Sequence, residues 1–337
     1  MFRQFTTSII VTIVATLGAL IVLGPGAAIT TLVLIAIEIA FSFDNAVINA
    51  KILERMTELW RRLFLTVGML IAIVGMRLVF PILIVSVTTK LGWQRVVDLA
   101  LNKPEEYAHF LEAAHVTISA FGGGFLLVLV LYFFMDHNRE ILWLDRIERP
   151  LQRLGGAQWL APIVAIVVIT SIALLSDHTS TVLGAGLSGA VGYSLLNFVI
   201  GLLGRLTGQS GVGKYTGWGA AIAFLYLEVL DASFSFDGVL GAFAITNSVP
   251  IIAIGLGVGA LWVRSITLFM VKNGTLAAYR YLEHGAHYAI LVLAAALLLS
   301  IFINIPDAIT GIAGLGVIGA SLIASREANA RHRRVET

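Results

Sequence analysis

The chain has 337 residues, of which 58% are hydrophobic and only 12% are charged, and its mean hydropathy is +0.93. Soluble domains carry about 25% charged residues, so this composition excludes an ordinary soluble protein and indicates a multi-span membrane protein. The net charge is only +2, so the basic residues are better explained as markers of membrane orientation than as a nucleic-acid-binding surface. The chain contains no cysteine, which excludes thiolate metal sites, disulfides and cysteine nucleophiles.

Ten segments of the chain are long and apolar enough to cross a membrane, which takes about 20 largely apolar residues. They lie near residues 5–24, 27–50, 62–87, 114–136, 158–176, 180–204, 216–241, 248–271, 285–303 and 307–325. We therefore expect an all-α, polytopic membrane protein with about ten transmembrane helices.

The positions of lysine and arginine give an independent indication of topology, because cytoplasmic loops are enriched in these residues. With the N-terminus in the cytoplasm, seventeen of the 22 basic residues fall on the cytoplasmic side, three on the opposite side and two within spans. This split predicts a multi-pass protein of the cell inner (cytoplasmic) membrane with both termini in the cytoplasm.

One acidic pattern occurs twice, in the second and the seventh of these segments. The first copy runs from Glu38 to Asp44 and the second from Asp231 to Asp237, each with Phe-Ser-Phe before the final aspartate. Carboxylates at membrane depth cost about 2.5 to 3.5 kcal/mol each, so four cost on the order of 10 kcal/mol. That cost is comparable to the whole stability of a typical domain. We therefore interpret the doubled motif as the functional site.

Further matches suggest that the two halves of the chain are repeats. Gly68 precedes Arg77 by nine positions in the third segment, and Gly255 precedes Arg264 by nine in the eighth. Ten spans divide into five and five, and an odd number per half predicts two inverted five-helix repeats. The expected parts are 1–137 (first repeat, spans one to four), 138–157 (cytoplasmic linker), 158–176 (span five, which completes the first repeat), 177–325 (second repeat, spans six to ten) and 326–337 (basic cytoplasmic tail).

Carboxylate, amide and hydroxyl oxygens without sulfur suit a hard divalent cation. The first copy offers Glu38, Asp44 and Asn45 as ligands, and the second offers Asp231 and Asp237. Ser42 and Ser235 are possible accessory hydroxyls. Glu38 and Asp44 would lie about 120° apart on a regular helix. For both to reach one site the helix must unwind locally, and Gly238 favours such unwinding in the second copy.

Two arginines and a third acid are candidates for gating or charge balance. Arg77 and Arg264 would occupy the acids when no cation is bound, either as a charge-swap gate or as static ion pairs. Glu228 lies three residues before Asp231 and has no counterpart in the first copy. It is a candidate proton carrier or ligand, and a simple hydrogen bond between spans is the alternative.

His115 and His287 are possible accessory residues, because similar sequences precede them at the starts of the fourth and ninth segments. With the expected topology they lie at opposite membrane surfaces, so an interfacial or hydrogen-bonded histidine is the alternative to a role at the site.

These motifs resemble the TerC family of integral membrane proteins. The likeness rests on the acid-x5-Asp-Asn pattern of the first copy and on the run from Glu228 to Gly238, and it extends over roughly residues 30–300. The resemblance implies membership of a broader group that includes lysine and cation exporters, with manganese efflux as an activity of several relatives. It also implies that the paired motifs hold the metal through the ligands Glu38, Asp44, Asn45, Asp231 and Asp237.

The leading hypothesis is therefore a secondary transporter that exports a divalent cation, with manganese favoured, through a midplane site. Its expected partners are the cation and the lipid bilayer. We expect no resident cofactor, no enzymatic activity and no nucleic acid, and the sequence leaves homo-oligomers open. One alternative is a scaffold or partner subunit of a metal-stress, tellurite-type resistance system. Another is an intramembrane aspartyl protease with Asp44 and Asp237 as a dyad, although the Gly-x-Gly-Asp context of such enzymes is missing.

Overall fold

The computed structural model describes residues 5–155, 159–206, 215–243, 245–246 and 248–335. Within these ranges, some side chains lie outside the description, namely those of residues 76, 80, 84, 88, 200, 203–206, 232–237, 240, 307–308 and 332–335. The described residues form helices and their connections, with a single isolated bridge between Met56 and Tyr215. The predicted all-α fold class is confirmed.

Seven helical segments within the described residues are long and apolar enough to cross a membrane, and eight if one bent helix pair counts as a span. The seven are Thr6–Leu23, Glu58–Val87, His115–Phe134, Thr179–Val199, Val249–Asn273, Leu282–Leu299 and Ile309–Arg331. The chain is therefore a polytopic helical membrane protein. Two predicted spans are not among these segments: α10 (Leu160–Leu175) is a shorter apolar helix of 16 residues, and α12 (Gly217–Phe243) has several side chains outside those described. The number ten stays a prediction.

The chain divides into two compact units, each built from two separate stretches of sequence. Unit 1 comprises Met1–His115 and Val212–Phe269. Its elements are α1 (Thr6–Leu23), α2 (Pro25–Phe41), α3 (Phe43–Glu54), α4 (Glu58–Leu63), the π-helical segments η2 (Phe64–Gly68) and η3 (Ile71–Val79), α5 (Phe80–Thr89), α6 (Trp93–Asn102), α7 (Pro104–Ala113), α12 and most of α13 (Val249–Asn273).

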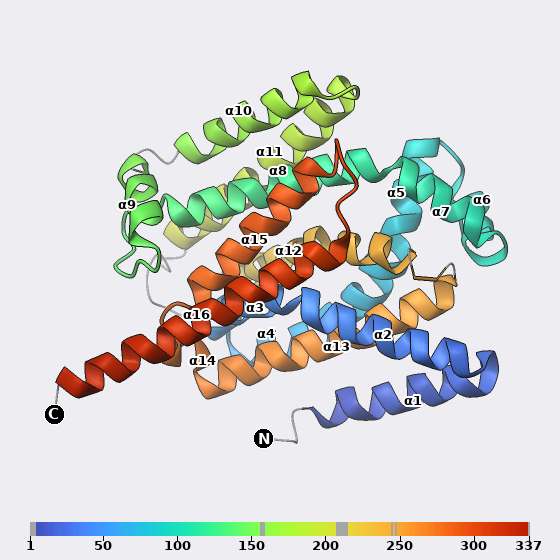
Figure 1. The fold of residues 1–337 in the computed structure, drawn as a ribbon, viewed down its shortest axis with the longest axis horizontal. Helices are drawn as coiled ribbons and strands as arrows, with labels where there is room; N and C mark the ends of the chain where they lie inside the picture. Colours follow the sequence, from blue (N-terminus) through green and yellow to red (C-terminus); the bar gives the residue numbers. More distant parts are fainter. Residues whose placement is uncertain (1–4, 156–158, 207–214, 244, 247, 336–337) are drawn as a thin grey trace. The chain divides into compact units, whose positions relative to one another are not determined.

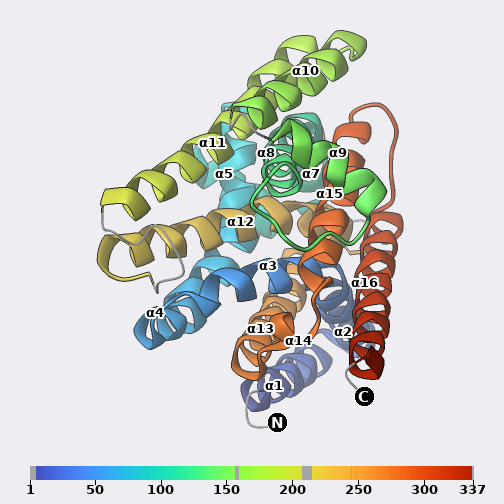
Figure 2. The same cartoon turned by 90° about the vertical axis from the view of Figure 1, so that its left-hand side faces the viewer.

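Unit 2 comprises Val116–Gly211 and Met270–Thr337. Its elements are α8 (His115–Phe134), α9 (Asp145–Leu154), α10, α11 (Thr179–Leu206), α14 (Thr275–Ala278), α15 (Leu282–Leu299) and α16 (Asp307–Val335). Within this unit α10 packs along α11 and α15 packs along α16, as Figures 1 and 2 both show. Each unit takes segments from both predicted repeats, and the inverted repeat itself stays a prediction.

Close helix packing in unit 1 buries the first acidic motif. Helix α1 turns back onto α2 at Gly24, whose φ of +91° is favourable only for glycine, and the two lie side by side in Figure 1. Helix α13 approaches α2 through two glycines one turn apart. A Cβ atom on Gly255 would lie 2.6 Å from Leu34 Cβ, and one on Gly259 would lie 2.5 Å from Glu38 Cγ. These glycines let two backbones approach closely.

Candidate functional site

The first acidic motif lies where a membrane helix is broken. Helix α2 ends at Phe41 and α3 begins at Phe43, and the two axes differ in direction by 54°. Between them Ser42 has φ −100° and ψ 18°, and its hydroxyl donates a hydrogen bond to Glu38 Oε1 at 3.0 Å. The local break expected in the first copy is therefore present, and it turns the chain between Glu38 and Asp44.

The second acidic motif lies on an unbroken helix, so the unwinding expected at Gly238 is wrong. Helix α12 continues from Gly217 to Phe243 through the whole motif. The glycine has a different use: a Cβ at position 238 would lie 3.1 Å from Glu38 Oε2. Gly238 thus lets α12 pass close to the carboxylate of the first motif. The side chains of Ser235 and Asp237 lie outside those described.

Glu38 is held by an arginine. Arg77, on η3, donates from Nη2 to Glu38 Oε1 at 2.5 Å, and its Nη1 donates to the carbonyl oxygen of Ala72 at 2.7 Å. Glu38 and Arg77 are each only 4% exposed, so this is a fully desolvated ion pair. A buried carboxylate needs such a partner because removal from water penalises its charged form.

The second half of the network centres on Arg264 of α13. Its Nη2 atom lies 3.1 Å from Glu228 Oε2 and 3.5 Å from Asp231 Oδ2, while Nη1 donates to the carbonyl oxygen of Phe64 at 2.5 Å. The guanidinium also lies over the Phe64 ring, 4.1 Å from its centroid, where the π-face attracts the cation. One guanidinium therefore forms ion pairs with two carboxylates.

A glycine makes this arrangement possible. A Cβ atom on Gly68 would lie 2.5 Å from Arg264 Nη1 and would collide with the Glu228 carboxylate. Sequence reasoning noted Gly68 only as a marker of the repeat. It missed the role of Phe64, for which the sequence carries no signal because its contribution is a backbone carbonyl and a ring face.

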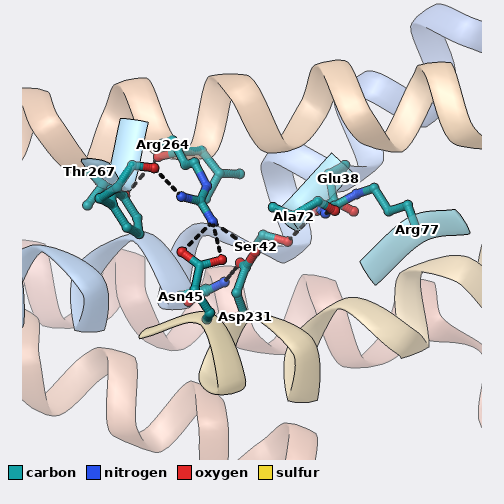
Figure 3. A network of polar contacts seen from close by, with 11 residues as sticks. Glu38, Ser42, Asn45, Ala72, Arg77, Asp231, Arg264 and Thr267 are labelled. Atoms are coloured by element: carbon teal, nitrogen blue, oxygen red, sulfur yellow. Dashed lines mark hydrogen bonds and ion pairs between the residues drawn. The ribbon is translucent and has the colours of Figure 1, made fainter. Parts of the chain in front are cut away.

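Asn45 links the two motifs (Figure 3). Its side-chain Nδ2 donates to Asp231 Oδ1 at 2.6 Å, and its backbone N–H donates to Asp44 Oδ1 at 2.9 Å. The side-chain oxygens of Asn45 and of Asn49, one turn further along α3, are buried and have no hydrogen-bond partner within the described part of the chain. The first and second motifs thus meet in unit 1, and two acceptor oxygens there are unused.

The charges of this network do not balance. The four acids Glu38, Asp44, Glu228 and Asp231 are each at most 7% exposed, and only Arg77 and Arg264 oppose them as buried cations among the described side chains. If all four carboxylates are ionised, two negative charges remain uncompensated. Because an unpaired charge in a low-dielectric interior is costly, this pocket favours an additional cation or bound protons.

The two histidines belong to different parts of the molecule. His287 lies in unit 2, where its ring stacks on Phe133 with centroids 3.3 Å apart and its Nδ1 hydrogen-bonds to the carbonyl oxygen of Glu283 at 2.8 Å. His115 begins α8, at the boundary between the two units. The contacts of His287 are those of a packed, hydrogen-bonded side chain.

No group of three or more histidine, cysteine, aspartate or glutamate side chains is arranged to hold a metal ion within the described part of the chain. Arg77 pairs with Glu38 and Arg264 with Asp231, two of the carboxylates that the sequence suggested as ligands, whereas Asp44 accepts a hydrogen bond from the backbone N–H of Asn45.

Comparison with known proteins places the chain in a family. No curated protein and no solved structure is significantly similar to it. Residues 43–332 match the model of one protein family, described as "Protein of unknown function (DUF475)". The match covers most of the chain and includes Asp44 and the whole second motif, although it begins after Glu38. The chain therefore belongs to the DUF475 family.

Proposed function

We propose that the protein is a secondary transporter that carries a divalent metal cation across the membrane, with manganese as the favoured ion and export as the direction. The observation that carries this proposal is the excess of buried acids over buried arginines. Among the described side chains, four ionised carboxylates against two guanidinium groups leave two negative charges, which one divalent cation would balance. The surrounding oxygen donors are of the type that magnesium, calcium and manganese prefer.

The arginines give the proposed site a second state. In this structure Arg77 holds Glu38, and Arg264 holds Glu228 and Asp231; in the proposed cycle these pairs form whenever the cation has left. An entering cation would compete with the guanidinium groups for the same oxygens. In such a charge swap the guanidinium groups compensate part of the carboxylate charge when the cargo is absent, which lowers the energy difference between the loaded and the empty carrier.

Two further points support the proposal. The break at Ser42 resembles the discontinuous helices that form the sites of many secondary transporters. The motifs resemble those of TerC proteins, several of which export manganese. Inverted repeats and a TerC-type mechanism are part of the proposal.

The test is cation flux into vesicles that contain the purified protein, with a manganese-sensitive dye inside. We expect Asp44→Asn, which removes a buried carboxylate with little change of shape, to abolish manganese flux. The matched control is Asp98→Asn, because Asp98 is a half-exposed carboxylate on α6, and this variant should transport normally. Normal flux through Asp44→Asn, or no flux of manganese, calcium, magnesium or zinc through the wild type, contradicts the proposal.

A membrane scaffold is the second candidate, and the direct ion pairs Arg77–Glu38 and Arg264–Glu228 favour it. In a scaffold these pairs would only lock helices together. Equilibrium binding of manganese to the purified protein distinguishes the candidates. A transporter binds the cation, and Asp44→Asn weakens the binding, whereas a scaffold binds none.

A further inference from the structure

Helix α9 is fixed to the ends of two membrane spans in unit 2. Its Glu148 accepts hydrogen bonds from two backbone N–H groups just before the helix, at 3.1 and 3.2 Å, and lies 3.3 Å from Nε2 of His284 in the first turn of α15. Gln152 donates to the carbonyl oxygen of Arg139, just after α8, at 2.7 Å. The helix is therefore docked against the C-terminal end of α8 and the N-terminal end of α15.

This docking places α9 at the surface of the membrane. Both α8 and α15 are long and apolar enough to span, so their ends lie close to the boundary between hydrocarbon and water. In Figure 1, α9 runs crosswise to α8 and α15. A helix at the end of two spans and crosswise to them lies along the bilayer surface.

The side of α9 that faces away from the protein has two distinct stripes. Apolar side chains form the first: Ile147 and Leu154 are 52% and 57% exposed. Arginines form the second, with Arg146, Arg149 and Arg153 at positions i, i+3 and i+7. At 100° per residue, Arg146 and Arg153 lie about 100° around the helix from Ile147 and Leu154, and the docked face with Glu148 and Gln152 lies about 130° from each of these pairs.

Two of the three arginines are available to an external anion. Arg149 pairs with Asp145 at 2.8 Å. Arg146 and Arg153 are exposed and form no ion pair within the part of the chain that the structure describes. Trp159, directly before α10, is 64% exposed, as is typical of an aromatic side chain at the headgroup level.

We propose that α9 binds anionic lipid headgroups of the leaflet on whose surface it lies. Arg146 and Arg153 pair with headgroup phosphates, and Ile147 and Leu154 reach the beginning of the acyl chains. An anionic lipid presents phosphate and hydrocarbon together, which matches the two adjacent stripes. A soluble anion or a nucleic acid would satisfy the arginines and leave the apolar stripe in water.

The first experiment measures bound lipid on the full-length protein by native mass spectrometry, with phosphatidylglycerol and phosphatidylcholine of equal chain length. We expect the wild type to prefer phosphatidylglycerol. The Arg146→Gln/Arg153→Gln double variant should bind it about 30-fold more weakly, or about fivefold per arginine, with phosphatidylcholine unchanged. The matched control is Arg62→Gln on α4, an exposed arginine that pairs with Glu58, and it should bind as the wild type does.

Wild-type affinity in the double variant, or an equal loss in Arg62→Gln, overturns the proposal. A second measurement does not depend on affinity. Because the chain has no cysteine, a fluorophore can be attached at Ile147→Cys or, on the same helix, at Asp145→Cys. In phosphatidylglycerol vesicles the first label should be quenched by spin-labelled lipid and the second by aqueous iodide. Equal iodide quenching at both positions also overturns it.

Discussion

Replacing Arg264 by leucine tests whether the acids of unit 1 depend on their buried counter-charges. The substitution removes the only buried guanidinium described beside Glu228 and Asp231, together with a hydrogen bond to the Phe64 carbonyl oxygen. Leucine has a similar apolar stem, so the main loss is the charge. Removing one partner of a buried ion pair costs about 3–5 kcal/mol because the other charge stays buried without compensation.

The two acids should respond differently to this loss. Asp231 keeps its 2.6 Å hydrogen bond from Asn45, whereas Glu228 accepts no other hydrogen bond within the described part of the chain. Adding Glu228→Gln to Arg264→Leu removes the stranded charge and should recover about 1.5–3 kcal/mol. Adding Asp231→Asn should recover less, since that carboxylate is still partly compensated.

The assay is the free energy of unfolding in one detergent, followed by the fluorescence of the tryptophan residues, for the single and double variants. Arg95→Leu is the control, because Arg95 is an exposed arginine on α6, and it should change stability by less than about 0.5 kcal/mol. The reasoning is refuted if Arg264→Leu behaves like Arg95→Leu, or if Glu228→Gln destabilises the protein further when Arg264 is already absent.

Three further variants test separate contacts. Gly259→Ala should destabilise by about 1–3 kcal/mol because the new methyl group overlaps the stem of Glu38, whereas Gly192→Ala, with no atom within 4 Å, should be neutral or stabilising in the same unfolding assay. Asn45→Ala should cost about 1.5–3 kcal/mol, since it leaves a buried carboxylate without its amide donor; an unchanged unfolding free energy contradicts the linking role. Burial raises the pKa of Glu148, but hydrogen bonds from a histidine and the backbone outweigh it, so the pKa lies below the usual 4.5. Its contribution to stability is therefore complete above pH 4.5 and lost as the pH falls through the lowered pKa, and Glu148→Gln should flatten this part of the pH profile.

Much of the fold follows from hydropathy, and the exceptions have physical causes. The segments near 5–24, 114–136, 248–271 and 285–303 became α1, α8, α13 and α15 with ends shifted by a few residues, because a continuous apolar run of this length allows few other structures. Hydropathy does not determine how far a helix extends at its ends or how it winds. The π-helical turns of η2 and η3 therefore had no sequence signal.

The site was predictable in part. The acids and arginines could be found because charges in apolar segments are rare. A break between Glu38 and Asp44 is expected from their separation of about 120° on a regular helix, and α2 does end at Phe41. The roles of Gly238 and Gly68 could not be found, because a glycine that permits a close approach looks the same in sequence as one that permits unwinding. The choice of carboxylates that pair with Arg264 depends on how α13 packs against α12. No local sequence pattern encodes this packing.

The winding of η3 has a consequence for Arg77. A π-helical turn holds more residues than an α-helical turn, so tightening one turn of η3 (Ile71–Val79) to α geometry shifts the register of the residues beyond that turn by one position. Such a shift rotates a side chain by about 100° around the helix axis. Arg77 lies near the end of this segment. A register shift of one position is therefore enough to turn its guanidinium away from Glu38 while the helix stays intact.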